Sequence, residues 1–212
     1  MALSTLTVRD GNNAAQTIPT LADLAGNRAS MVSLDSSQQV YRASANFTPT
    51  ATAAVTMISI TGSATKTVRI RRIAIGGVST AVSGSVLALQ KTSALGAGGT
   101  TVSPTIAKLD SASATATALV SHYTTTLKAT GTTTGMGGPL TTRYIGTNVV
   151  TTPATVYTDS YVTLFPEGGA PIGQALVLRG TAEIIEVQNV TPANLGAGTV
   201  YSYCIEWVED DS

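Results

Sequence analysis

The sequence predicts an all-β fold, an antiparallel β-sandwich. Threonine and valine are abundant, and their branched Cβ atoms favour strands. After residue 46, about eight or nine strand-like runs recur at roughly 10–20-residue spacing, with no long amphipathic helix between them. Eight strands in about 160 residues fit a jelly roll. An immunoglobulin-type sandwich is the alternative, although its Cys…Trp…Cys pattern is absent.

The clearest strand signals are short apolar runs that glycine and proline separate. We expect strands at Ala54–Ile60, Thr67–Ile75, Gly84–Gln90, Arg143–Val150, Thr155–Leu164, Gln174–Leu178, Thr181–Val187 and Val200–Val208. In the second of these, Val68 and Ile70 share one face, whereas Ile73 falls on the other. This change of phase predicts a β-bulge near Arg71 and Arg72.

Residues 1–47 differ from the rest of the chain. Thr5–Arg9 is a strand pattern, and Asp10-Gly11 after it favours a turn. The polar stretch that follows has no long periodic segment. We therefore expect an extended N-terminal arm with one or two short strands over residues 1–47, and the jelly-roll sandwich over residues 48–212.

Composition excludes several classes of protein. Charged residues make up only 11% of the chain, but hydrophobic residues reach 43% and the net charge is zero, so we expect a folded chain. No apolar run approaches the roughly 20 residues that span a bilayer, and the N-terminus lacks a signal-peptide pattern. A surface rich in threonine and serine is typical of one that neighbouring subunits cover.

Charge is unevenly distributed along the chain. Residues 1–166 carry 11 Lys/Arg and 5 Asp/Glu (11 − 5 = +6), and residues 167–212 carry 1 and 7 (1 − 7 = −6). The preferred interpretation is that the two parts interleave in one sheet and neutralise each other locally. The alternative is a pair of complementary faces that join subunits or bind a partner.

Residues that carry chemistry are few. His122 is the single histidine and Cys204 the single cysteine, so no catalytic triad, disulfide framework or usual zinc set is expected, and we predict no enzyme activity, metal or cofactor. We expect Cys204 to be an inert buried thiol. Glu183 and Glu186 could act as a glycosidase pair, but residues three apart in a strand lie on opposite faces.

Two charged clusters remain. Arg69, Arg71 and Arg72 form the basic one, and we expect these sheet-face arginines to pair with the acidic C-terminal strand, with a subunit or capsid contact as the second choice. The acidic run Glu209, Asp210 and Asp211 favours a solvated tail. Aromatic residues are too sparse for a nucleic-acid surface.

The opening TVRDGNNAAQTI resembles the N-terminal stretch of small tailed-phage virion proteins. VRIRRIAIGG, ALVLRGTAEIIEV and the closing YSYCIEWVED are similar to jelly-roll proteins that decorate or cement phage heads, and to some tail and baseplate proteins. The resemblance covers both ends of the chain and thins out over residues 100–150. It implies a protein that sits on the capsid surface, often as a trimer, and uses arms to clasp its neighbours.

These observations lead to one principal hypothesis, a capsid decoration or cement protein bound to the major capsid protein or other virion proteins, with no nucleic acid, membrane or small-molecule partner. The expected contacts are Leu6 and Val8 in the arm, Arg69, Arg71 and Arg72 in the sheet, and Glu209, Asp210 and Asp211 at the end. Deleting residues 1–45 should then abolish particle binding and leave the body folded.

Two alternatives stay open. The first is a tail, baseplate or head-fibre component of the virion. The second is a carbohydrate-binding module, which needs Tyr201, Tyr203 and Trp207 on an exposed face, although their apolar strand favours a place in the core or an interface.

Overall fold

The computed structural model describes residues 4–9, 15–20, 39–49, 55–79, 83–124, 129–149, 161–166, 175–190 and 199–211, the first two ranges as backbone only. The chain forms two compact units, Met1–Gln38 and Gln39–Ser212. In the first unit, β1 (Ser4–Arg9) and β2 (Ala15–Thr20) pair antiparallel as a two-stranded sheet of their own.

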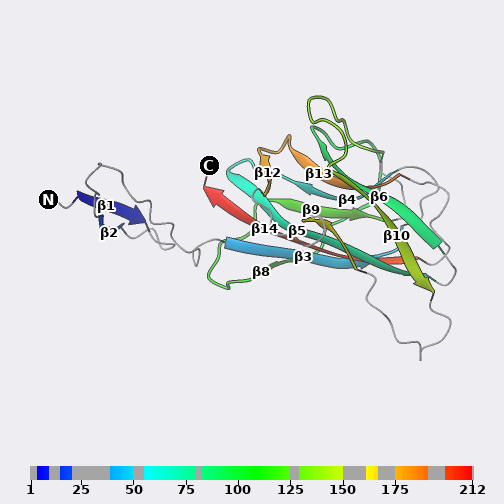
Figure 1. The fold of residues 1–212 in the computed structure, drawn as a ribbon, viewed down its shortest axis with the longest axis horizontal. Coiled ribbons are helices and arrows are strands. Elements are labelled where there is room, and N and C mark those ends of the chain that lie inside the picture. The colour runs from blue at the N-terminus through cyan, green and yellow to red at the C-terminus, as the bar shows by residue number, and fades with distance from the viewer. Residues whose placement is uncertain are drawn as a thin grey trace. The chain divides into compact units, whose positions relative to one another are not determined.

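In its described ranges, the second unit contains twelve strands and no helix. Figure 1 shows how these strands are arranged. They are β3 (Gln39–Phe47), β4 (Val55–Thr61), β5 (Lys66–Ser79), β6 (Ser83–Thr92), β7 (Thr101–Val102), β8 (Ile106–Lys108), β9 (Leu119–Tyr123), β10 (Thr141–Val149), β11 (Val162–Phe165), β12 (Leu176–Arg179), β13 (Ile184–Asn189) and β14 (Val200–Asp211). The predicted strand at 155–164 lies mostly outside the described residues.

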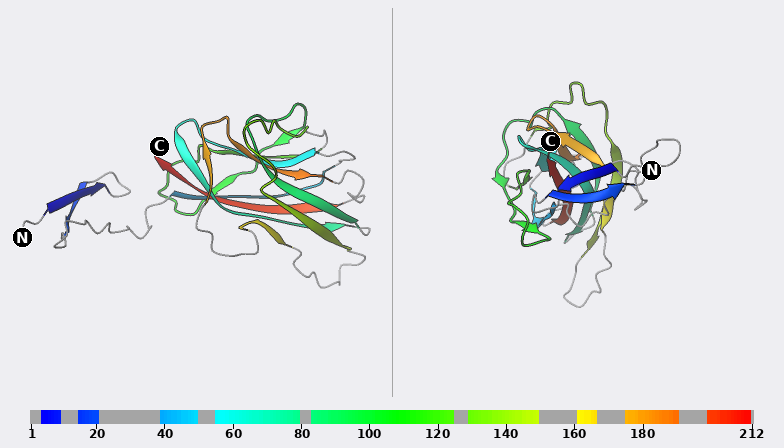
Figure 2. Two further views of the ribbon diagram at one scale, coloured as in Figure 1. Left: turned by 45° about the horizontal axis from the view of Figure 1, so that its top comes forward. Right: turned by 90° about the vertical axis from the view of Figure 1, so that its left-hand side faces the viewer.

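The strands lie in two layers, which Figure 2 shows from the side. The β14 layer has the order β5-β14-β3-β8, with β12 and β11 pairing along the other side of β5. The β13 layer has the order β7-β9-β4-β13-β6-β10. All pairs are antiparallel except the short contact of β10 with the end of β5, which joins the two layers.

The opposite side of the sandwich is joined by one segment, residues 101–108. Its β7 pairs with β9 at the edge of the β13 layer, and its β8 pairs with β3 at the edge of the β14 layer. Both edge strands are very short, which limits the unpaired backbone that a sheet edge presents to other chains.

The core lies between the layers. Its largest fully buried side chains include Trp207, Tyr201 and Tyr203 from β14, with isoleucines and leucines from β4, β5 and β6. Two polar contacts cross the core, since His122 Nδ1 lies 3.1 Å from Tyr203 Oη and Ser85 Oγ lies 2.8 Å from Tyr201 Oη. These contacts satisfy the tyrosine hydroxyls where water cannot reach them.

The predicted class, an all-β antiparallel sandwich, is confirmed, and its jelly-roll connectivity stays a prediction. The boundary of the arm differs from the prediction. Gln39–Phe47 is not part of the arm, because β3 pairs with β14 along its whole length, so the first unit ends at Gln38. Periodicity alone could not assign this strand, whose neighbour in the sheet is at the far end of the chain.

Candidate functional site

The predicted bulge in β5 is present and decides which arginines are exposed. Opposite β14, Arg72 pairs with Glu206 while Ile70 pairs with Trp207, so Arg71 is the extra residue. Both Arg71 and Arg72 are exposed, whereas the isoleucines on either side are buried. The bulge therefore places two consecutive arginines on the outer side of the β14 layer, where regular alternation would send one of them inward.

Two ion pairs join this face to the acidic C-terminal strand. Arg69 Nε donates to Asp210 Oδ2 at 2.6 Å, and Arg42 Nε on β3 donates to Glu206 Oε1 at 2.9 Å. The side chains are partly exposed, so each pair contributes only about 0.2–1 kcal/mol. The predicted pairing of the sheet-face arginines with the C-terminal strand is confirmed for Arg69.

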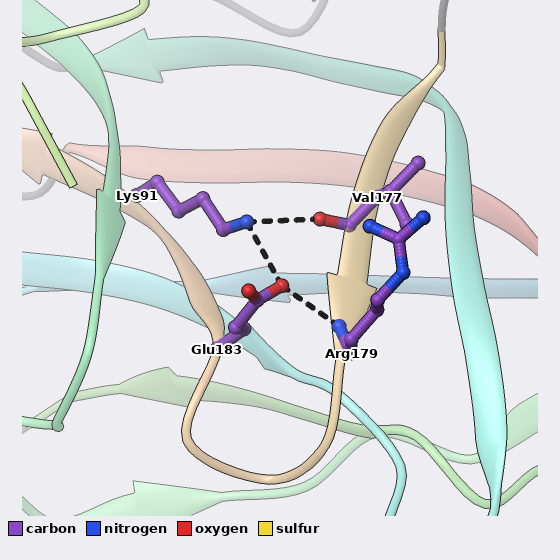
Figure 3. Close-up of polar contacts among 4 residues, drawn as sticks. All are labelled: Lys91, Val177, Arg179 and Glu183. Atoms are coloured by element: carbon purple, nitrogen blue, oxygen red, sulfur yellow. Dashed lines mark hydrogen bonds and ion pairs between the residues drawn. The ribbon is translucent and has the colours of Figure 1, made fainter. Parts of the chain in front are cut away.

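A third pair ties together three parts of the fold (Figure 3). Lys91 Nζ on β6 donates to Glu183 Oε2 at 2.8 Å and to the Val177 carbonyl of β12 at 3.1 Å, and Arg179 N donates to the same Glu183 oxygen at 2.8 Å. Burial alone would raise the pKa of Glu183, but these hydrogen bonds outweigh burial and lower it. The cluster fixes β12 and the turn before β13.

Each of these three ion pairs connects a base from residues 1–166 with an acid from residues 167–212. The preferred interpretation of the charge asymmetry, local neutralisation within one fold, is confirmed for these pairs. Because these pairs lie within one chain, they compensate part of the asymmetry along the sequence locally.

Glu209 differs from the prediction that the acidic run at the C-terminal end is a solvated tail. This side chain is buried, and its carboxylate accepts hydrogen bonds from Thr117 N, Thr117 Oγ1, Ala118 N and Trp207 Nε1 at 2.6–3.0 Å. It is therefore neither a solvated tail nor an available contact, because its oxygens hold the segment before β9 against β14. Because Glu209 belongs to an acidic run at the C-terminal end, the sequence pattern did not indicate that its carboxylate is buried.

The sequence analysis also assigned Asp210, Asp211, Leu6 and Val8 as assembly contacts. Asp210 pairs with Arg69, and Asp211 lies opposite Lys66 in register, with its side chain outside the described part. In the hairpin of the first unit, Leu6 lies opposite Ile18 and Val8 opposite Gln16.

Most of the side chains that the sequence analysis considered for sugar binding or catalysis lie in the core. Tyr201, Tyr203 and Trp207 are at most 1% exposed, so they provide no platform for a sugar. His122 is also buried, and burial lowers its pKa. Cys204 differs from the prediction, because it is half-buried beside outward-facing residues of β14, and burial raises the pKa of its thiol.

A buried polar layer on the outer side of the β13 layer was not predicted. Ser59, Glu186 and Gln90 form one row across β4, β13 and β6, and all three are buried. Residues 93–100 and 129–140, which we call the flap, are linked by backbone hydrogen bonds and contact this row. The signal in the sequence was a single glutamate inside the apolar run Ile-Ile-Glu-Val, which β alternation alone does not place under a loop.

Glu186 is the centre of this layer. Its Oε2 accepts hydrogen bonds from Thr56 Oγ1 (2.7 Å), Gln188 Nε2 (2.7 Å) and Gly131 N of the flap (3.0 Å). These partners are separate from those of Glu183, which contacts Lys91 and Arg179 N instead.

The described residues contain no group of three or more His, Cys, Asp or Glu side chains that could hold a metal ion. Within those same ranges, no helix is long and apolar enough to cross a membrane. Comparison of the chain with protein-family models, curated proteins and solved structures gave no match.

Proposed function

We propose that this chain is a structural protein of a tailed-phage virion, a decoration protein that binds the outer surface of the capsid and stabilises it. The observation that carries the proposal is the division of the chain into a sandwich and a separate unit with a two-stranded sheet. A two-stranded sheet by itself is marginally stable in water. In this proposal, a neighbouring virion protein supplies a surface on which the hairpin packs.

The register of the hairpin supports this role. Leu6 and Ile18 are cross-strand partners, whereas Val8 lies opposite Gln16, so the register aligns one apolar pair across the two strands. Main-chain pairing of such a hairpin with an exposed strand of a capsid protein provides affinity, and the many copies on a shell multiply it.

The sandwich supplies the rigid body of this assembly. The β5 bulge turns Arg71 and Arg72 outward, and both are exposed on the outer side of the β14 layer. These two arginines are the contact that we assign to the sandwich. The resemblance to trimeric cement proteins favours a homotrimer.

The decisive experiment is deletion of residues 1–38 rather than 1–45. The longer deletion removes most of β3 and exposes the edge of β14, so loss of binding would then follow from a damaged sandwich. The shorter deletion is expected to keep the thermal midpoint of the sandwich and to abolish co-sedimentation with phage heads. Unchanged binding by the deletion variant would refute the role of the arm.

The number of copies per particle distinguishes a head decoration protein from a tail or baseplate component. A decoration protein is present in hundreds of copies, whereas a tail or baseplate ring has far fewer. Quantitative mass spectrometry of purified particles, or cryo-EM density over the shell, distinguishes these two places.

A further inference from the structure

Three buried side chains beneath the flap are arranged as a nucleophile, a base and an acyl group. Glu186 Oε2 accepts a hydrogen bond from Thr56 Oγ1 at 2.7 Å and another from Gln188 Nε2 at 2.7 Å. Thr56, Glu186 and Gln188 are 1%, 0% and 7% exposed. A hydroxyl that is hydrogen-bonded to a base is the arrangement of an activated nucleophile, and here the same carboxylate oxygen also contacts a carboxamide.

A β-bulge in β4 brings the hydroxyl to this side of the sheet. β13 pairs with β4 at Val187 opposite Ile58 and then at Gln188 opposite Thr56, so Met57 is the extra residue. Regular alternation would turn Thr56 inward with Ile58. The bulge instead makes Thr56 the cross-strand partner of Gln188, and the Cβ atoms of such partners are about 4.5–5.5 Å apart. Bulges are common beside active sites, where they redirect a side chain.

We propose that Thr56 and Gln188 react to form an intramolecular ester, which links β4 covalently to β13, with Glu186 as the base. Glu186 takes the proton of Thr56 Oγ1 while this oxygen attacks Cδ of Gln188. The tetrahedral intermediate then collapses, the Cδ–Nε2 bond breaks, and Glu186 gives the proton to the leaving nitrogen, which departs as ammonia. A C–O bond replaces a C–N bond, no electron is transferred, and the carboxylate is regenerated.

The flap and the burial of the site favour this reaction. Gly131 N of the flap donates to Glu186 Oε2 at 3.0 Å, and Thr56 Oγ1 lies 3.4 Å from the Ala129 carbonyl, so the flap covers the reacting groups. Exclusion of water slows hydrolysis of the ester, whereas ammonia escapes to the solvent and is protonated there. Holding both groups on one oxygen also replaces a bimolecular encounter. The cross-link is independent of the capsid proposal, since it uses neither the arm nor the arginines.

The test is mass spectrometry of the full chain. The intact protein should be about 17 Da lighter than its sequence predicts, which is the mass of one ammonia. Trypsin cuts after lysine and arginine, so Thr56 lies in the peptide 43–66 and Gln188 in the peptide 180–212. These two peptides should be recovered as one linked pair. Loss of ammonia at an asparagine stays within one peptide, so the linked pair identifies the ester.

Four variants make the test specific. Thr56→Val removes the nucleophile with little change in shape, and Glu186→Gln removes the base, so both should keep their full mass and give no linked pair. Thr56→Ser retains a hydroxyl and should form the link. Thr92→Val is the matched control, because it removes another fully buried hydroxyl, whose Oγ1 has no hydrogen-bond partner. This variant should lose ammonia as the wild-type chain does.

A wild-type chain with its full sequence mass would overturn the proposal, and so would a linked pair that persists in Thr56→Val. In either case the three side chains are a hydrogen-bonded layer that only holds the flap in place. Because the mass of the wild-type chain decides by itself, a variant that fails to fold would not prevent a decision.

Discussion

His122 Nδ1 lies 3.1 Å from Tyr203 Oη and so joins β9 to β14 across the core. The ring of Phe47 packs 5.1 Å from the imidazole, measured between ring centroids. Burial lowers the pKa of His122 and raises that of Tyr203, so both side chains are neutral near pH 7. This neutral pair makes the stability of the sandwich dependent on pH.

We expect the sandwich to lose stability in mild acid. The unfolded chain takes up a proton at its histidine near the ordinary pKa of 6.5, whereas the folded chain resists protonation to a lower pH. The unfolded state therefore binds more protons below this value, and the free energy of unfolding falls as the pH decreases. Urea denaturation between about pH 7.5 and pH 5 measures the effect.

The control for this prediction is His122→Gln. His122 is the only histidine, so the variant should be less stable at neutral pH but should show a flatter pH profile over the same range. An unchanged profile in the variant would assign the acid sensitivity to carboxylates instead.

Replacing Glu209 with glutamine should destabilise the protein by about 2–4 kcal/mol, because the amide nitrogen would face donors that the carboxylate now satisfies. Asp210→Asn on the adjacent position of β14 should cost no more than about 1 kcal/mol, since its partner Arg69 is partly exposed. Equilibrium unfolding in urea compares the two variants. Equal costs would contradict the assignment of Glu209 as a buried anchor.

Trp207 provides a direct optical test of the buried C-terminal strand. It is the only tryptophan and is 0% exposed, with its ring stacked near Tyr41 at a centroid distance of 5.8 Å. Its fluorescence should resist quenching by acrylamide in the native protein and become quenchable on unfolding. Addition of oligosaccharides should leave the emission unchanged, whereas a sugar-dependent shift would reopen the carbohydrate-binding alternative.

Reversing the charge of Arg71 and Arg72 together should weaken binding to phage heads and leave the fold intact. Both side chains are exposed on the bulge, where surface substitutions usually change stability by less than about 0.5 kcal/mol. The loss of binding should depend on salt, because screening acts on exposed charges. Arg143→Glu on β10 serves as the control, and an equal loss in this variant would show that the effect follows net charge alone.

The sequence by itself determined the all-β class and the bulge near Arg71. These features depend on local alternation and composition, which a strand displays along its own length. The pairing of Arg69 with the C-terminal strand could also be predicted, because complementary charge in a small sheet protein has few other partners.

Only the tertiary structure decided the rest. Gln39–Phe47 belongs to the sandwich because β14, at the other end of the chain, pairs with it. Glu209 and Glu186 became buried anchors because loops distant in sequence deliver N–H groups to them. Local patterns describe which face a residue takes, but burial depends on what the rest of the chain places over that face.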